Sequence, residues 1–335
     1  MSSSPQRKAH RILVSRFILC AVFILAALGQ SRAAALDKLS VAGGSFATIV
    51  AQEKGFYAAR HLQVDVRQLG NSDAVRSALS SGAVEIADFG VDNAFAMAEH
   101  GDDIVIIMAD ENSPIQMVGQ KGIATVDQLR GKAILVDAPN TQNAVIMKRI
   151  LAKQGLTAGV DYVMREAGGQ PLRLAALRKD PALGGTMVAW PVYFQMKAEG
   201  YPSLGSSLDV VGPMLFLGSF VKRDWAKSHR DIAVRYLAAD VEAVRWMTDP
   251  KHKADVVALF EKSRGLSPAV SQIAYDNYMG PYGWVRDGKV DLATLARVMK
   301  LRAEVEGSWG SNPPPPETYV DTRYLRDALK AVGRK

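Results

Sequence analysis

The sequence predicts an α/β protein built from two similar lobes, and three observations support this fold class. Short apolar segments that suit β-strands alternate with helical segments, as in parallel sheets joined by right-handed crossovers. The same order of elements occurs twice, in residues 38–90 and in residues 132–190. The chain also lacks a linker long enough to separate independent domains.

The first copy starts with the strand KLSVA (38–42), which ends in GGSF and enters a helix reaching Lys54. The strand QVDVRQ (63–68), the helix DAVRSALSS (73–81) and the strand EIADFG (85–90) follow. Their apolar spacings are those of half-buried strands and amphipathic helices.

The second copy repeats this order of strand, helix, strand, helix and strand. Its segments are KAILVD (132–137), NAVIMKRILAKQG (143–155), DYVMRE (161–166), LRLAALRK (172–179) and TMVAW (186–190). Each helix is followed by glycine or a turn segment, which is typical of a helix end.

Two strands, at 104–109 and 115–120, leave the first lobe, and the segment 214–222 reads as a strand that returns to it. The rest of the chain is helical, interrupted by the stiff PPPP segment. The predicted division is a leader at 1–35, the first part of lobe 1 at 36–112, lobe 2 at 113–215, and the return to lobe 1 with C-terminal helices at 216–335.

The first 35 residues read as a secretory signal peptide. Basic residues precede the 13-residue apolar run FILCAVFILAALG, and Ala33 and Ala35 suit A-x-A cleavage. An uncleaved membrane anchor is the alternative, but the run is shorter than the roughly 20 residues that span a bilayer. Cys20 follows Leu19 rather than a small residue, so we expect no lipid anchor.

Removal of the leader nearly neutralises the chain. The full chain has 41 basic and 34 acidic residues, and the leader carries five of the basic residues and none of the acidic ones. The mature chain therefore has 36 basic and 34 acidic residues, a net charge of about +2. No dense basic stripe remains, so nucleic acid is not an expected partner. Cys20 is the only cysteine, so the mature chain has no thiol for a disulfide, a nucleophile or a metal, and we expect no metal site.

The segment ADFGVDNAFAMAEHG (87–101) predicts one wall of a ligand cleft. In open α/β sheets, ligands lie outside the carboxyl ends of the strands, where helix N-termini favour anionic groups. Gly90 lets the chain turn closely, and the helix from Asp92 offers its amino end. Asp92 and Asn93 either contact ligand or only cap this helix.

Other candidates lie at matching places in the two copies. In APNTQN, Asn140 or Thr141 suits a cap while Gln142 or Asn143 faces the cleft. Asn71 and Gln170 occupy matching places in the two copies, and the alternative interpretation is that they are turn residues. For Trp190 the alternative is packing in the core. The predicted ligand-binding residues are Ser45, Phe46, Asn71, Asp92, Asn93, Thr141, Gln142 and Trp190.

The expected ligand is a small organic solute. The cleft loops GGSF, GNSD, GVDN and PNTQN contain no arginine or lysine, whereas Asp73 and Asp92 bring negative charge. Bidentate anion recognition would normally use arginine, so this argues against a small inorganic anion in a basic clamp. An anionic end on backbone N–H groups and an apolar body against Phe46 and Trp190 fit better.

No catalytic residue or cofactor is expected. The mature histidines, His61, His100, His229 and His252, are scattered, and neither H-E-x-x-H nor G-x-S-x-G occurs. Surface histidines are the simpler interpretation.

Several segments in order resemble one family. They are GGSF, EKGFYAARHLQVDV, ALSSGAVEIADFG, LRGKAILV, AKQGL and FVKRDWAKSHRDIAVRYLAADVEA. Residues 36 to about 280 resemble the SsuA/THI5-like substrate-binding proteins of nitrate, sulfonate and taurine type ABC importers. The resemblance implies a type II periplasmic-binding fold of two lobes around a hinge, with the ligand in the cleft and a membrane permease as partner. Together with the cleaved leader we expect a periplasmic location, and we expect a monomer.

One departure affects the expected site. Relatives often carry a W-E-P type segment after the second-lobe strand, whereas this chain has Ala189, Trp190 and Pro191 without glutamate.

Two alternatives to transport stay open. One is a cofactor-free enzyme of the same fold. The thiamine-pyrimidine synthases that share this fold are not a model for it, because they rely on a cysteine-rich segment that this chain lacks. The other is a ligand-sensing subunit of a membrane receptor.

The leader gives a direct test. If cleavage follows Ala35, the secreted protein should begin at Leu36, as N-terminal sequencing or intact-mass measurement would show. Full-length protein retained in the cytoplasm would contradict the secretory interpretation.

Overall fold

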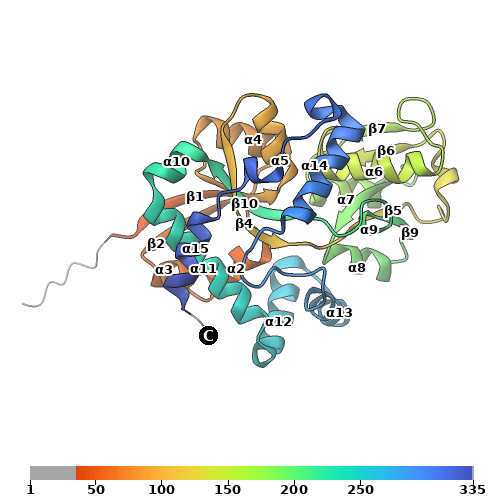
Figure 1. Ribbon diagram of the computed structural model, residues 1–335. Coiled ribbons are helices and arrows are strands. Elements are labelled where there is room, and N and C mark those ends of the chain that lie inside the picture. Colours follow the sequence, from red (N-terminus) through yellow and green to blue (C-terminus); the bar gives the residue numbers. More distant parts are fainter. Residues whose placement is uncertain (1–34, 334–335) are drawn as a thin grey trace, which may run out of the picture. The chain divides into compact units, whose positions relative to one another are not determined.

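The computed structural model describes residues 35–333, which contain two five-stranded sheets (Figure 1). The predicted leader lies outside the described residues apart from Ala35. Each sheet is the centre of one lobe, and the chain passes between the sheets through residues 112–114 and 207–216.

The first sheet has the strand order β2-β1-β3-β10-β4. Its strands are β1 (Asp37–Gly43), β2 (Leu62–Arg67), β3 (Ile86–Gly90), β4 (Ile104–Glu111) and β10 (Leu217–Lys222). β1 is parallel to β2 and β3, whereas β10 is antiparallel to β3 and β4. Every residue of β4 is buried, which explains its nearly continuous apolar run.

The second sheet has the order β7-β6-β8-β5-β9 and repeats the arrangement of the first. Its strands are β5 (Ile115–Gly119), β6 (Ala133–Val136), β7 (Val163–Glu166), β8 (Gly185–Ala189) and β9 (Ser203–Ser206). β6 is parallel to β7 and β8, and β5 is antiparallel to β8 and β9. The sequence did not predict β9, because SLGS has neither apolar alternation nor β-branched residues.

Helices cover both faces of the first sheet. Successive residues of β1 point to opposite faces, so Val41 packs in one core cluster and Ala42 in another. One face carries α2 (Phe46–Glu53), α3 (Phe56–Ala59), α11 (Arg230–Met247) and, against α11, α15 (Arg323–Val332). The other face carries α4 (Ser72–Ser81) and α5 (Asp92–Glu99), and α10 (Arg223–Ser228) follows β10.

The second sheet is covered in the same way. One face carries α6 (Gln142–Lys153) and α9 (Ser207–Val210), and the other carries α7 (Gln170–Lys179) and α8 (Val192–Ala198). The 3₁₀ turns are η1 (Val126–Leu129), η2 (Pro250–His252), η3 (Ser308–Ser311) and η4 (Pro316–Tyr319).

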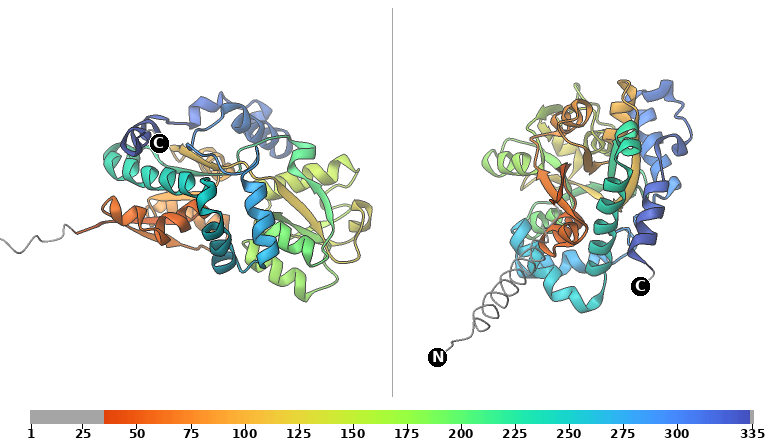
Figure 2. Two further views of the ribbon diagram at one scale, coloured as in Figure 1. Left: turned by 90° about the horizontal axis from the view of Figure 1, so that it is seen from below. Right: turned by 90° about the vertical axis from the view of Figure 1, so that its left-hand side faces the viewer.

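The C-terminal helices contact both lobes (Figures 1 and 2). These are α12 (Lys253–Arg264), α13 (Pro268–Tyr278) and α14 (Leu292–Glu306). α13 packs on α8, and α14 packs on both α5 and α6. Arg302 of α14 donates to Glu99 of the first lobe at 2.8 Å and to the Asn140 carbonyl of the second at 2.9 Å. None of the helices between residues 35 and 333 combines the length and apolarity needed to cross a membrane.

The return strand β10 should be essential to the first lobe. Phe220 is fully buried in the middle of this strand. We expect Phe220→Ala to lower the free energy of unfolding by about 3–5 kcal/mol, because it removes a large buried ring and leaves a cavity. Urea unfolding would measure this. Val160→Ala, at a residue that is 82% exposed, should change stability by less than about 0.5 kcal/mol; equal losses would contradict the packing argument.

Candidate functional site

A cavity of about 610 Å³ lies between the two sheets, at the carboxyl ends of their central strands. Gly43 and Gly90 end β1 and β3 on one side, while Asp137 and Trp190 follow β6 and β8 on the other. At Gly43, φ is +87° and an added Cβ would lie 2.6 Å from the Asp88 carbonyl oxygen, so this turn needs glycine, whereas a Cβ at Gly90 would make only a tight contact of 3.1 Å with Asp92 Oδ1. This edge is where unpaired backbone groups and helix N-termini meet.

Seven of the eight predicted ligand-binding residues line this cavity. They are Phe46, Asn71, Asp92, Asn93, Thr141, Gln142 and Trp190. Ser45 does not line it, because it is the N-cap of α2. Its backbone N–H donates to Asp88 Oδ2 at 2.6 Å, and its hydroxyl accepts the Thr48 N–H at 3.4 Å.

Several of these residues already have structural roles as caps. Asn71 accepts the Ala74 N–H at 2.8 Å, and Thr141 accepts the Ala144 N–H at 3.4 Å. The interpretation of Asp92 or Asn93 as the cap of their own helix is wrong. The N-cap position of α5 is Val91, and Asn93 donates to the Gly90 carbonyl at 3.0 Å.

Asp92 instead contacts the other lobe. Its Oδ2 accepts the backbone N–H of Gln142, the first residue of α6, at 2.6 Å. Asp137 of the second lobe does the converse: its carboxylate accepts the N–H of Ser72, the first residue of α4, at 3.2 Å, and also the Ser72 hydroxyl. We call these the two aspartate contacts. Each satisfies a first-turn N–H that has no partner within its own helix.

Further contacts hold the lobes together beside the cavity. The Gly169 N–H donates to the Gly70 carbonyl at 2.8 Å. Arg76 of α4 donates to Asn93 at 2.9 Å and to Asn140 of the second lobe at 3.2 Å. The structure therefore has its lobes in direct contact through paired polar groups.

The carboxyl group of Asp92 is buried at a cost. Burial raises its pKa to about 6, even though Arg302, Arg76 and the Gln142 N–H all lower it. Burial thus outweighs the favourable charges and the hydrogen bond.

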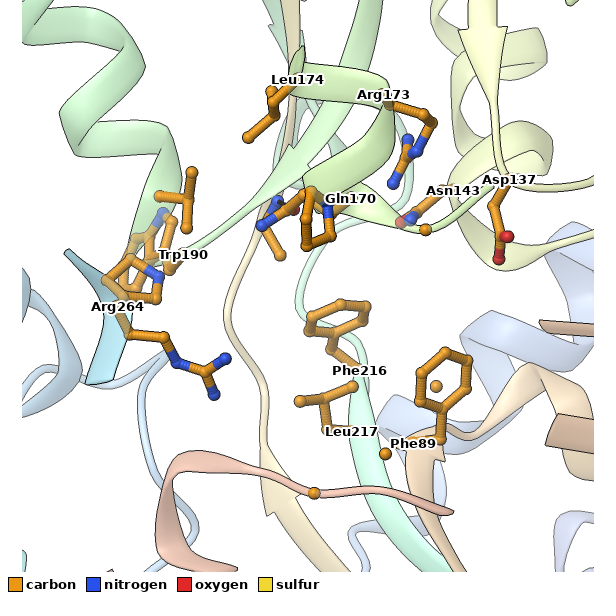
Figure 3. A pocket seen from close by; sticks show the side chains of 18 of the residues that line it. Phe89, Asp137, Asn143, Gln170, Arg173, Leu174, Trp190, Phe216, Leu217 and Arg264 are labelled. Atoms are coloured by element: carbon orange, nitrogen blue, oxygen red, sulfur yellow. Dashed lines mark hydrogen bonds between the residues drawn. The ribbon is translucent and has the colours of Figure 1, made fainter. Parts of the chain in front are cut away.

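Arginine side chains reach the cavity from helices, and the sequence of the cleft loops did not predict them. Arg173 and Arg178 come from α7, and Arg264 ends α12 (Figure 3). Arg173 is buried and donates to Thr186 Oγ1 at 2.9 Å and to the Met187 carbonyl at 3.0 Å, and burial lowers its pKa to about 10. The argument from the loops that no basic side chain serves the cleft is therefore wrong.

Several buried polar atoms of lining residues have no hydrogen-bond partner within residues 35–333. The donors are Arg173 Nε and Trp190 Nε1, and the acceptors are Gln142 Oε1 and Asn143 Oδ1. Buried polar groups are normally paired, so these atoms are suited to contacts with a bound molecule or water.

Apolar side chains make up the rest of the wall. Phe89, Phe216, Leu217 and Trp190 surround the cavity in Figure 3. Phe46 mainly belongs to an aromatic cluster, since its ring stacks on Phe260 with centroids 4.1 Å apart. The cavity suits a ligand with both an apolar body and polar ends.

Neither a histidine nor a metal cluster marks this site. His61, His100, His229 and His252 all lie outside the cavity lining. Within residues 35–333, no group of three or more His, Cys, Asp or Glu side chains is arranged to hold a metal ion.

Two α/β lobes with a cleft at their strand ends define a periplasmic binding protein fold. The profile of the family described as NMT1/THI5 like matches residues 44–252, and the chain belongs to this family. This confirms the resemblance found in the sequence. No curated protein matches the chain by sequence.

Solved structures share the fold at low sequence identity. A protein from Bordetella bronchiseptica RB50 is 19% identical with a TM-score of 0.75, covering 88% of this chain and 97% of its own. The nitrate-binding protein NrtA from Synechocystis PCC 6803 is 16% identical with a TM-score of 0.70, covering 89% of each chain. The alkanesulfonate-binding protein SsuA from Xanthomonas axonopodis pv. citri, bound to MOPS, is 15% identical with a TM-score of 0.67, covering 86% of this chain and 98% of its own.

Asp92 should make stability depend on pH. Its pKa of about 6 in the folded protein exceeds the ordinary value of 3.8, so the folded state keeps a proton that the unfolded state has lost between these values. The contribution of Asp92 to the free energy of unfolding is therefore greatest below pH 4 and falls as the pH rises to about 6. Relative to wild type, Asp92→Asn should gain about 2–3 kcal/mol in free energy of unfolding between pH 4 and pH 7.

Urea unfolding at several pH values would measure this difference. Asp224→Asn, at an exposed position, is the control and should follow the wild-type profile. Parallel wild-type and Asp92→Asn profiles would show that Asp92 is not buried as described.

Proposed function

We propose that this protein is the solute-binding component of an ABC importer and captures a small organic solute in the interlobe cavity. Family membership, the fold and the named transport proteins that share it support this role. The observation that carries the proposal is the cavity itself, whose buried walls combine apolar side chains with unpartnered polar atoms. Such a lining suits capture of a small molecule.

The protein would act in the periplasm after loss of residues 1–35, as a monomer that docks on a membrane permease. We propose that the lobes open and close about the two crossing segments, 112–114 and 207–216. Hinge closure buries the ligand and excludes water. The two aspartate contacts lie between the lobes, so opening would have to break them.

The seven lining residues predicted from sequence remain our candidates for ligand contact, with different roles. Gln142 and Trp190 each present an unpartnered buried atom. Asn71, Thr141 and Asp92 act through the helix ends they satisfy. Their first effect would be to position the cavity walls.

An enzymatic role has less support. The family's structural relatives with functional names are mostly ligand-binding proteins. Nucleophilic catalysis needs an activating base close to the nucleophile, and histidine is the commonest such base. The cavity lining contains no histidine, and the chain after residue 35 contains no cysteine. A sensing role would use the same cavity and differ only in the membrane partner.

A thermal-shift screen tests the function. Sulfonates, aromatic carboxylates, pyrimidines and inorganic anions would be compared, and a ligand at about 100 times its dissociation constant should stabilise the protein by roughly 2.7 kcal/mol. We expect an organic solute to give the largest shift. A larger shift with nitrate or sulfate would exclude the organic-solute assignment, and turnover of a hit would indicate an enzyme.

Solution scattering on the best ligand would test the closure step. The radius of gyration should fall on binding, because the lobes close on the ligand. An unchanged radius with a confirmed tight ligand would contradict hinge closure while leaving solute binding intact.

A further inference from the structure

Arg264 differs from the other arginines of the cavity because its guanidinium has no partner among residues 35–333. Arg178 pairs with Glu199 at 3.0 Å, and Arg173 donates to Thr186 and Met187. Within the described part of the chain, Arg264 makes no ion pair or side-chain hydrogen bond, and its side chain extends toward the cavity (Figure 3). Arg264 is thus available to bind an anionic group.

The helix N-termini around the cavity are less available. The Gln142 N–H of α6 donates to Asp92, and the Ser72 N–H of α4 donates to Asp137. The Ser45 N–H before α2 donates to Asp88. A ligand anion near these three ends would meet protein carboxylates, so the N-termini of α2, α4 and α6 are not the natural anion subsite here.

Glu111 lines the same cavity and is buried at the end of β4. Its Oε1 accepts the Ser113 hydroxyl at 2.6 Å. Burial raises the pKa of Glu111 to about 7, while the Ser113 hydroxyl, the Arg264 cation and the Tyr278 hydroxyl lower it and Asp88 raises it. Asp110, the preceding residue, is a further buried carboxyl group that interacts with Glu111.

We propose that Arg264 binds the anionic group of an organic solute and that Glu111 takes up a proton from solvent when this happens. This inference rests on the proposed solute-binding function of the cavity. In the ligand-free protein, the Arg264 cation favours the ionised Glu111 carboxylate. A bound anion offsets the positive charge of Arg264, so the ionised Glu111 carboxylate loses that stabilisation in a low-dielectric site and the neutral carboxylic acid is favoured. Phe89, Phe216 and Leu217 would contact the apolar body of the solute.

The sign of the pH dependence follows from this linkage. Below pH 7 Glu111 already carries its proton in the ligand-free protein, so affinity should be nearly constant. Above pH 7 each binding event takes up as much as one proton, so affinity should fall by up to about tenfold per pH unit. Ligands without a negative charge should lack this dependence.

Calorimetry on the mature protein with defined probes tests the proposal. The probes are benzoate, benzenesulfonate, the uncharged benzamide and inorganic nitrate, measured at pH 6, 7 and 8 in two buffers of different ionisation enthalpy. At least one organic anion should bind at least tenfold more tightly than benzamide and nitrate, and should take up protons at pH 7–8.

Three variants separate the roles of the side chains. Arg264→Gln should weaken organic-anion binding by about 10- to 100-fold, the range for loss of a charged hydrogen bond. Arg286→Gln is the matched control, because Arg286 is exposed and does not line the cavity. Glu111→Gln should retain binding but lose proton uptake and the decline above pH 7. Thermal melting of each variant would confirm that it is folded.

The outcomes distinguish this inference from the function on which it rests. Wild-type affinity in Arg264→Gln, or an unchanged pH slope in Glu111→Gln, would overturn the anion subsite. Binding of uncharged solutes alone would also overturn it while leaving solute capture intact. If neither these probes nor the wider solute screen gave a ligand, both proposals would fail.

Discussion

The arrangement of the two lobes depends on the use of helix N-termini by carboxylates of the opposite lobe. The first-turn N–H groups of a helix lack intrahelical partners, and a carboxylate nearby gains from both the hydrogen bond and the helix dipole. Asp92 satisfies α6 and Asp137 satisfies α4, so each lobe completes a helix of the other. Asp92 is buried, so this contact is made in a water-poor environment, and that burial opposes the charge and raises the pKa of Asp92.

These contacts also determine which groups remain for a ligand. The backbone N–H groups of Gln142, Ser72 and Ser45, which could otherwise bind an anion, are engaged by protein carboxylates. Among residues 35–333, the side-chain groups left unpartnered at the cavity include Arg173 Nε, Trp190 Nε1, Gln142 Oε1 and the Arg264 guanidinium. These side chains come from both lobes, so their arrangement around the cavity depends on how the lobes are positioned.

The C-terminal helices connect this positioning to the rest of the chain. α14 packs on α5, which carries Asp92, and on α6, whose first N–H donates to Asp92. Arg302 on α14 pairs with Glu99 and also lowers the pKa of Asp92. α12 brings Arg264 to the cavity, while its neighbour α13 packs on α8 of the second lobe. The packing of the two lobes and the electrostatics of the cavity thus depend on the same helices.

The sequence by itself determined the repeated α/β order, the positions of the central strands and the loops that line the cavity. These follow from local periodicity and from the rule that parallel strands end at one edge of a sheet. Local sequence also made Thr141 recognisable as a cap candidate, whereas the cap role of Asn71, which was expected to be a ligand contact or a turn residue, was not predicted. Family membership rests on the same ordered segments.

Only the tertiary structure decided the partners of those residues. Asp92 bonds to Gln142, 50 residues away, instead of capping its own helix. Arg173 and Arg264 reach the cavity because helices α7 and α12 pack beside it, although no cleft loop carries a basic residue. Ser45 is turned away from the cavity by its bonds to Asp88 and Thr48. Local sequence specifies backbone periodicity, but charge pairing across the lobes depends on distances that only the packing of distant segments sets.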